Sequence, residues 1–182
     1  MRALILTAVA ILAGCETTNS IPYKASTSNI IAIKQVTAPK SLKVNVGTVE
    51  LAGGVEEHPM CRLMGPVTVA PGKTLPQYIK DAFVEELYAA QAFDPQATNV
   101  INARIDSLSF SSVSPASWSI AVSFSSTALP GGYGVAETYR FDTSFTAFSA
   151  CKNVADAFGP AVQELLGHAV ASPDFAALVG AH

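Results

Sequence analysis

Nine residues near the middle of the chain, Ser117–Ser125, alternate strictly between small side chains and larger apolar ones. Because successive side chains of a β-strand point to opposite faces, this pattern predicts a strand with one buried and one solvent-facing side. Comparable alternation occurs at Val100–Ser112 and Tyr139–Ala147, and turn-rich segments separate the three runs. The sequence therefore predicts an antiparallel meander. Within Val100–Ser112 the apolar residues switch from odd-numbered to even-numbered positions. Because the side-chain period of a strand is two, this switch predicts a β-bulge near Asp106–Ser107.

A further strand and two helical segments flank this meander. Leu42–Val46 alternates like a half-buried strand, and Thr74–Gln77 has the form of a capping box followed by apolar residues at helical spacing. A second apolar stripe, Val162–Val170, predicts a C-terminal helix that Asn153 would cap and Pro160 would kink or restart. Together these patterns predict an α+β domain: an antiparallel sheet of four to six strands with two main helices packed on one face.

The chain opens with a positive charge at Arg2 and an apolar run from Ala3 to Ala13. This run is too short to span a bilayer core, which takes about 20 residues, but it fits the hydrophobic region of a signal peptide. It ends in Leu12-Ala13-Gly14-Cys15, which resembles the lipobox of bacterial lipoproteins. The resemblance implies that residues 1–14 are removed and that Cys15 is lipidated. An ordinary secretory signal with an incidental cysteine is the alternative.

The lipobox resemblance also implies a location. In lipoproteins of this kind, an aspartate after the modified cysteine usually retains the protein in the inner membrane, whereas Glu16 stands at this position here. Stable anchoring takes more than one acyl chain, which a triacylated Cys15 would supply. We therefore expect a lipid-anchored, periplasm-facing protein of the outer membrane.

The charges divide the remaining chain into two parts. Residues 15–40 carry a net charge of +2 and predict a polar tether, while residues 41–182 carry a net charge of −6 and predict a single domain. Within the tether, Ile30–Ile33 is too apolar for a solvated linker. This segment is interpreted either as an edge strand of the domain or as a docking segment for a partner, and we favour the strand.

Three cysteines are an odd number for an exported protein, but assigning Cys15 to lipid leaves the pair Cys61 and Cys151. In an oxidising compartment this pair predicts a disulfide. One alternative is two separate buried thiols. Another is a zinc site completed by His58 and His168, although the paired C-x-x-C spacing typical of such sites is absent.

The composition excludes several functional classes. Only 14% of the residues are charged, against about 25% in a typical soluble domain. The formal net charge of −3, without a basic stripe, argues against nucleic-acid binding. The sequence contains no P-loop, dinucleotide-binding, nucleophile-elbow or zinc-protease motif. We therefore predict no catalytic residue, cofactor or metal, and we expect the protein not to be an enzyme.

The shortage of charge is concentrated in Ser107–Ala136, which has no charged side chain and holds ten of the seventeen serines. On the predicted strand, the face opposite the apolar residues would be small, polar and uncharged. Because the cores of protein interfaces are depleted in charge, we interpret this face as a docking surface for a partner. Alternatively, the protein's own N-terminal segment covers it. The residues concerned are Ser117, Ser119, Ser123 and Ser125.

The order of elements behind a lipobox is similar to that of short bacterial lipoproteins such as the YajG-like group and accessory lipoproteins of envelope machinery. This similarity concerns element order and length only, and it transfers no site residue. We expect a non-catalytic accessory or assembly factor that binds another envelope protein. The alternative is a carrier of a small molecule or lipid, which would use the gap between Trp118–Phe124 and the helix of Leu75–Ala90.

Overall fold

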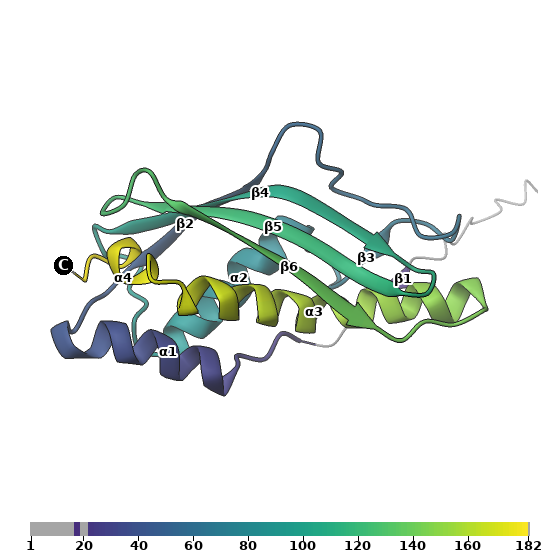
Figure 1. Ribbon diagram of the computed structural model, residues 1–182. Helices are drawn as coiled ribbons and strands as arrows, with labels where there is room; N and C mark the ends of the chain where they lie inside the picture. The colour runs from purple at the N-terminus through teal and green to yellow at the C-terminus, as the bar shows by residue number, and fades with distance from the viewer. Residues whose placement is uncertain (1–16, 19–21, 182) are drawn as a thin grey trace, which may run out of the picture.

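The computed structural model describes residues 17–18 and 22–181 and contains a four-stranded sheet with helices packed against it (Figure 1). The spatial order of the strands is β2-β4-β5-β6. The predicted α+β class and number of strands are confirmed. The strands are β2 (Asn45–Leu51), β4 (Val100–Ser111), β5 (Ala116–Ser126) and β6 (Tyr133–Phe141).

The sheet is only partly antiparallel. β5 lies antiparallel to both β4 and β6, as predicted, but β2 pairs with β4 in parallel. The prediction of a wholly antiparallel sheet is therefore wrong at this edge. The cause is the helix α2 (Leu75–Ala89), which separates the two strands in sequence and packs against β2. Parallel neighbours need such a crossover, because the chain must return to the end where the first strand began.

The meander has the predicted bulge and a shorter last strand than predicted. Ile105 pairs with Val122 and Ser107 pairs with Ala121, so Asp106 is the extra residue in β4. β6 ends at Phe141, and the alternation expected to reach Ala147 does not continue as a strand. Phe145 instead lies in the loop before the next helix and is fully exposed.

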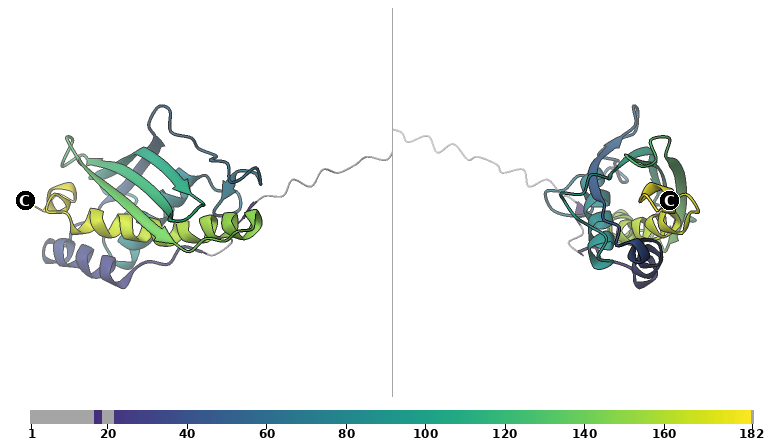
Figure 2. Two further views of the ribbon diagram at one scale, coloured as in Figure 1. Left: turned by 45° about the vertical axis from the view of Figure 1, so that its right-hand side comes forward. Right: turned by 90° about the vertical axis from the view of Figure 1, so that its left-hand side faces the viewer.

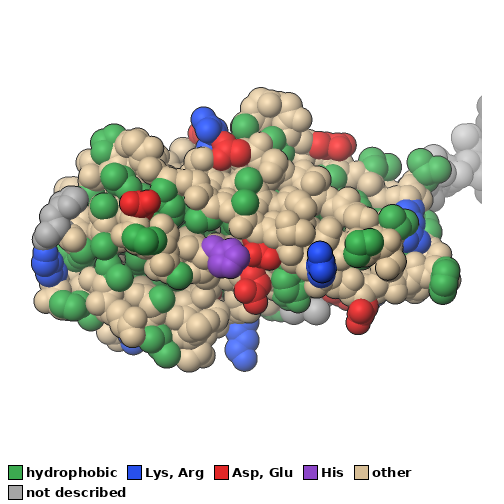
Figure 3. Space-filling view, in the orientation of Figure 1, with side chains coloured by type: hydrophobic (Ala, Val, Ile, Leu, Met, Phe, Trp, Pro, Cys, Tyr) green, Lys and Arg blue, Asp and Glu red, His purple; other side chains and the backbone are tan. Residues whose placement is uncertain are grey.

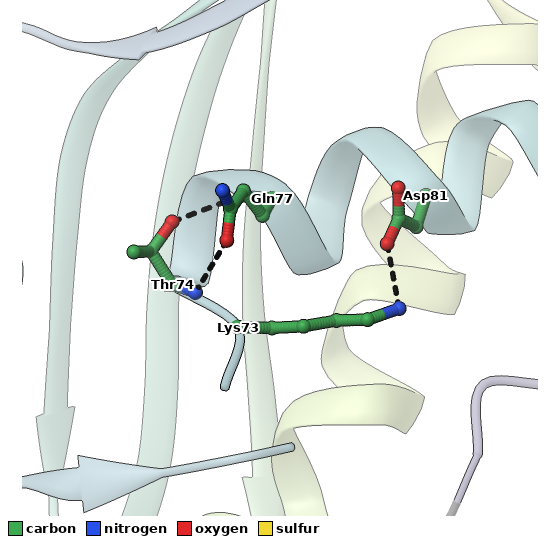
Figure 4. Close-up of polar contacts among 4 residues, drawn as sticks. All are labelled: Lys73, Thr74, Gln77 and Asp81. Carbon is green, nitrogen blue, oxygen red and sulfur yellow. Dashed lines mark hydrogen bonds and ion pairs between the residues drawn. The ribbon is translucent and has the colours of Figure 1, made fainter. Parts of the chain in front are cut away.

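The start of α2 is fixed by the predicted capping box (Figure 4). The hydroxyl of Thr74 accepts a hydrogen bond from the Gln77 amide at 3.3 Å, and the Gln77 side-chain oxygen accepts one from the Thr74 amide at 3.0 Å. Lys73 and Asp81 form an exposed ion pair at 2.6 Å beside it. The reciprocal bonds satisfy amides that have no partner within the helix, which explains why α2 begins here.

The C-terminal helix is longer than predicted. α3 spans Ala147–Ala171 without interruption at Pro160, and the short helix α4 (Phe175–Leu178) follows it. The side chain of Thr146, not of Asn153, accepts the capping bond from the Ser149 amide. Asn153 lies inside the helix, where its side chain donates to the backbone oxygen of Asp142 at 2.9 Å.

The segment Ile30–Ile33, expected as a strand or docking segment, belongs to a helix. α1 covers Thr27–Thr37, and a 3₁₀ turn, η1, covers Ala38–Lys40. The strand interpretation is therefore wrong, and residues 27–40 are folded onto the domain instead of forming part of a tether. The buried side chains of Asn29, Ile33 and Thr37 lie four residues apart, so they share one face of the helix.

These elements form three layers (Figure 2). α3 packs against β5 and β6, α2 packs against β2, and α1 lies across both helices on the side away from the sheet. Aromatic rings fill the space between sheet and helices: Trp118 lies 4.9 Å from Phe158, and Phe83 lies 5.6 Å from Phe124, between ring centroids. No helix within the described residues is long and apolar enough to cross a membrane.

Candidate functional site

The predicted lipidation site, Cys15, and the signal segment lie outside the described residues, so both remain predictions. The strand β1 (Thr17–Thr18) begins two residues after Cys15. β1 pairs in parallel with the two-residue strand β3 (Val67–Thr68) and lies against α3.

The predicted disulfide between Cys61 and Cys151 is confirmed. Their Cα atoms are 5.8 Å apart, and both residues are fully buried. The bond fastens the long loop that follows β2 to the first turns of α3. Because both sulfurs are in this bond, they are not available as the zinc thiolates of the alternative interpretation. His168 lies elsewhere on α3, where its imidazole Nδ1 is 3.1 Å from a carboxylate oxygen of Glu137.

The structure brings the four predicted surface serines together on one side of β5. Ser117, Ser119, Ser123 and Ser125 are half-buried, whereas the residues between them, except Ala121, are fully buried against the helices. We call these four residues and their outward-facing neighbours on β4 and β6 the serine face.

Strand register defines the neighbours. Ser119 lies between Ser109 of β4 and Thr138 of β6, so three hydroxyl side chains form one row across the sheet. The next rows contain Ser107, Ala121 and Ala136 on one side and Ser111, Ser117 and Arg140 on the other. Small side chains leave the sheet backbone close to its outer surface, where a flat partner can approach it.

Charged groups lie at both ends of the serine face: Arg140 in the row of Ser117, and Arg104 and Asp106 beside Ser123. Ser123 Oγ donates to Asp106 Oδ2 at 2.5 Å, and Arg104 Nε donates to Asp106 Oδ1 at 2.7 Å. The Ser123 hydrogen bond, followed by the Arg104 contact, holds the pKa of Asp106 below its ordinary value, although partial burial opposes this shift. The carboxylate therefore stays ionised, and its charge is matched by Arg104.

The helices leave the serine face uncovered. α2 and α3 occupy the opposite side of the sheet, and α1 lies farther out on that same side (Figure 2). Residues 22–40 of the N-terminal segment thus pack on the helical side, and this part of the chain does not cover the serines as the alternative interpretation required. Within the described residues, the serine face therefore keeps the features predicted for a docking surface.

Comparisons with known proteins add a fold resemblance only. The sequence matches no protein-family model and no curated protein. The chain is similar in structure to protein XCC0632 from Xanthomonas campestris, whose structure is described with the family DUF330. The TM-score is 0.45 with 10% sequence identity, and the alignment covers 71% of this chain and 84% of that one.

The space proposed for a carried ligand is filled by side chains. Phe83 of α2 contacts Phe124 of β5, and both rings are at least 98% buried. Trp118 is fully buried between Phe110 and Phe158, and its indole nitrogen donates to the backbone oxygen of Val154 at 2.8 Å. The gap between strand and helix is the hydrophobic core of the domain.

Two polar residues that the sequence interpretation did not single out organise the structure. Arg62 connects three loops, because its guanidinium donates to Ser112 Oγ at 2.9 Å and to the backbone oxygen of Ser144 at 3.2 Å. It also donates to the backbone oxygen of Ser112. A lone arginine in a loop carries no local signal of such a role.

Glu86 is the second of these residues. It is fully buried, and one of its oxygens accepts hydrogen bonds from Tyr23, Ser26 and Asn29. Burial and the Glu86 hydrogen bond raise the pKa of Tyr23, which keeps its hydroxyl proton available as a donor. Here a signal was present: Glu86 occupies the position seven residues after Ile79 on the apolar stripe of α2, where a carboxylate needs a partner.

Proposed function

We propose that this protein is a non-catalytic, periplasm-facing lipoprotein of the outer membrane, which acts as an accessory or assembly factor by binding another envelope protein through the serine face. The observation that carries the proposal is the uncovered, mostly uncharged outer surface of β4, β5 and β6. Natural sheets generally protect such surfaces and edges with charged side chains. A surface with few of them, and none in its central row, fits a partner whose contact area is flat and mostly uncharged.

The contact chemistry of the serine face suggests how the partner would be held. Hydroxyl groups of the central row can donate to or accept from a partner's backbone and polar side chains. The Arg104–Asp106 pair at the border would fix orientation more than affinity, because charges at the rim of an interface contribute little to binding energy.

The substitution Ser119→Lys tests this proposal, because a lysine there has no acidic neighbour in its row and would project into the contact area. Crosslinking in native envelopes, followed by mass spectrometry, should show a partner attached to the wild-type chain and lost in the variant. Gln96→Lys is the matched control, since it adds the same charge at an exposed position after α2. Equal crosslinking by wild type and Ser119→Lys would reject the serine face as the docking surface.

A further inference from the structure

Large apolar side chains are exposed at the end of the molecule where α3 begins. Leu63 is 97% exposed and Phe145 is fully exposed, while Val113 and Phe148 are 61% and 65% exposed. We call these four residues the apolar tip. Figure 3 shows hydrophobic side chains gathered at this end, with few charged groups among them. Exposed apolar clusters of this kind mark contact surfaces for proteins or membranes.

Hydrogen bonds hold together the three loops that form most of the apolar tip. Leu63 comes from the loop after β2, Val113 from the β4–β5 connection, and Phe145 from the β6–α3 connection. Arg62 joins these loops through the bonds described above, and it also approaches the backbone oxygen of Phe145 at 3.4 Å. Thr143 Oγ1 donates to the backbone oxygen of Ser112 at 2.6 Å.

The backbone is strained at Arg62 and at the exposed Leu63. Their φ angles are 44° and 60°, in the left-handed region that large side chains rarely adopt. The neighbouring Cys61 is fixed by its disulfide to α3. Strain of this kind persists only where the surrounding contacts impose it, and it is found at binding sites. Here it coincides with a leucine exposed to solvent.

The N-terminal end of the described chain lies at the same end of the molecule. β1 pairs with β3 and lies against α3, next to the apolar tip (Figure 1). Cys15 is two residues before Thr17, and two extended residues reach at most about 7 Å. A lipid on Cys15 would therefore leave the protein beside the apolar tip.

We infer that the apolar tip inserts into the headgroup region of the phospholipid bilayer that holds the lipid of Cys15. This inference rests on the lipidation in the proposed function and adds a second membrane contact, made by the folded domain. Phenylalanine and leucine side chains favour the boundary between headgroups and acyl chains. In this orientation the long axis of the domain points away from the membrane. The serine face runs along the strands and therefore stays accessible to a partner.

Tryptophan quenching tests the inference on the full lipidated chain. The variants Phe145→Trp and Val113→Trp place an indole on two different loops of the apolar tip. Tyr88→Trp is the matched control, because Tyr88 is 74% exposed but lies near the end of α2, where β2 and β4 begin. The protein is reconstituted into vesicles of phosphatidylethanolamine and phosphatidylglycerol with brominated acyl chains. The native Trp118 is fully buried and also fluoresces. Its contribution is measured on the unsubstituted chain and subtracted.

Contact with the bilayer should quench the tip indoles about twofold more than the Tyr88→Trp indole and shift their emission to shorter wavelength. Equal quenching at all three positions, on chains that float with the vesicles, would overturn tip insertion while leaving the lipid anchor intact. Failure of the unsubstituted chain to float would reject the lipid anchor and this inference with it.

Discussion

The side-chain amide of Asn29 donates hydrogen bonds to Glu86 Oε1 at 3.1 Å and to the backbone oxygen of Gln163 at 3.0 Å, so that one residue of α1 joins α2 to α3. The hydroxyl of Tyr23 and the amide of Ser26 donate to the same carboxylate oxygen, at 2.7 Å and 2.9 Å. The second oxygen, Oε2, has no partner among the described residues. The buried carboxylate therefore depends on α1 and the segment before it.

Asn29→Ala should lower the free energy of unfolding by about 1–3 kcal/mol, because it removes a donor from a buried carboxylate. Urea denaturation followed by circular dichroism measures this change. Gln35→Ala, on the exposed side of the same helix, is the control and should change stability by less than about 0.5 kcal/mol. Equal stabilities for the two variants would show that the Asn29 bonds contribute nothing.

The contrast between β5 and α1 shows what local sequence can predict. Small and larger apolar residues alternate strictly along Ser117–Ser125, so the sequence alone predicted both the strand and which of its faces is buried. Ile30–Ile33 is a short apolar run that fits either a strand or a helix. The preceding residue, Asn29, holds this helix against α2 through Glu86, 57 residues away, and the local sequence carries no sign of that contact. Local sequence also could not predict the parallel pairing of β2, because this pairing depends on where α2 returns the chain. It could not predict the apolar tip either, because three loops that are distant in sequence meet there.

Removing the disulfide with the double variant Cys61→Ala/Cys151→Ala should lower the free energy of unfolding by roughly 4–5 kcal/mol in the loop-entropy account. The bond closes a loop with a sequence separation of 90, which is why the expected effect is large. Denaturation of the wild type with and without reductant gives an independent measurement of the same quantity. A midpoint unaffected by reductant would contradict the prediction, provided that thiol counting confirms reduction.

Ser123→Ala should raise the pKa of Asp106 toward its ordinary value, because the hydroxyl is the main group that lowers it. A carboxylate with a lowered pKa stabilises the fold at pH above its unfolded value, and this contribution is lost as the pH falls through the folded value. The variant should therefore lose less stability than the wild type on acidification below about pH 4. NMR titration of the Asp106 carboxyl carbon measures the pKa directly, with Ser119→Ala as a control that leaves it unchanged.

Cys15→Ser should release the protein from membranes into the soluble fraction, because the lipid on Cys15 is the proposed anchor. Fractionation of cells with immunodetection measures the distribution. Cys61→Ser/Cys151→Ser is the control: it replaces the two disulfide cysteines but keeps Cys15, and should leave the protein in the membrane fraction. Continued membrane association of Cys15→Ser would remove the anchor from the proposed function.

Arg62→Ala should loosen the three loops of the apolar tip without unfolding the domain, because the guanidinium bonds join these loops while the aromatic core lies elsewhere. Hydrogen bonds to charged groups contribute about 1.5–3 kcal/mol, so amide exchange in residues 112–115 and 142–146 should accelerate by roughly tenfold or more. Hydrogen exchange with mass spectrometry resolves these segments. Arg140→Ala removes an exposed arginine from β6 and should leave their exchange unchanged. If both variants exchange like the wild type, then the loops are held by other contacts, and the apolar tip does not depend on Arg62.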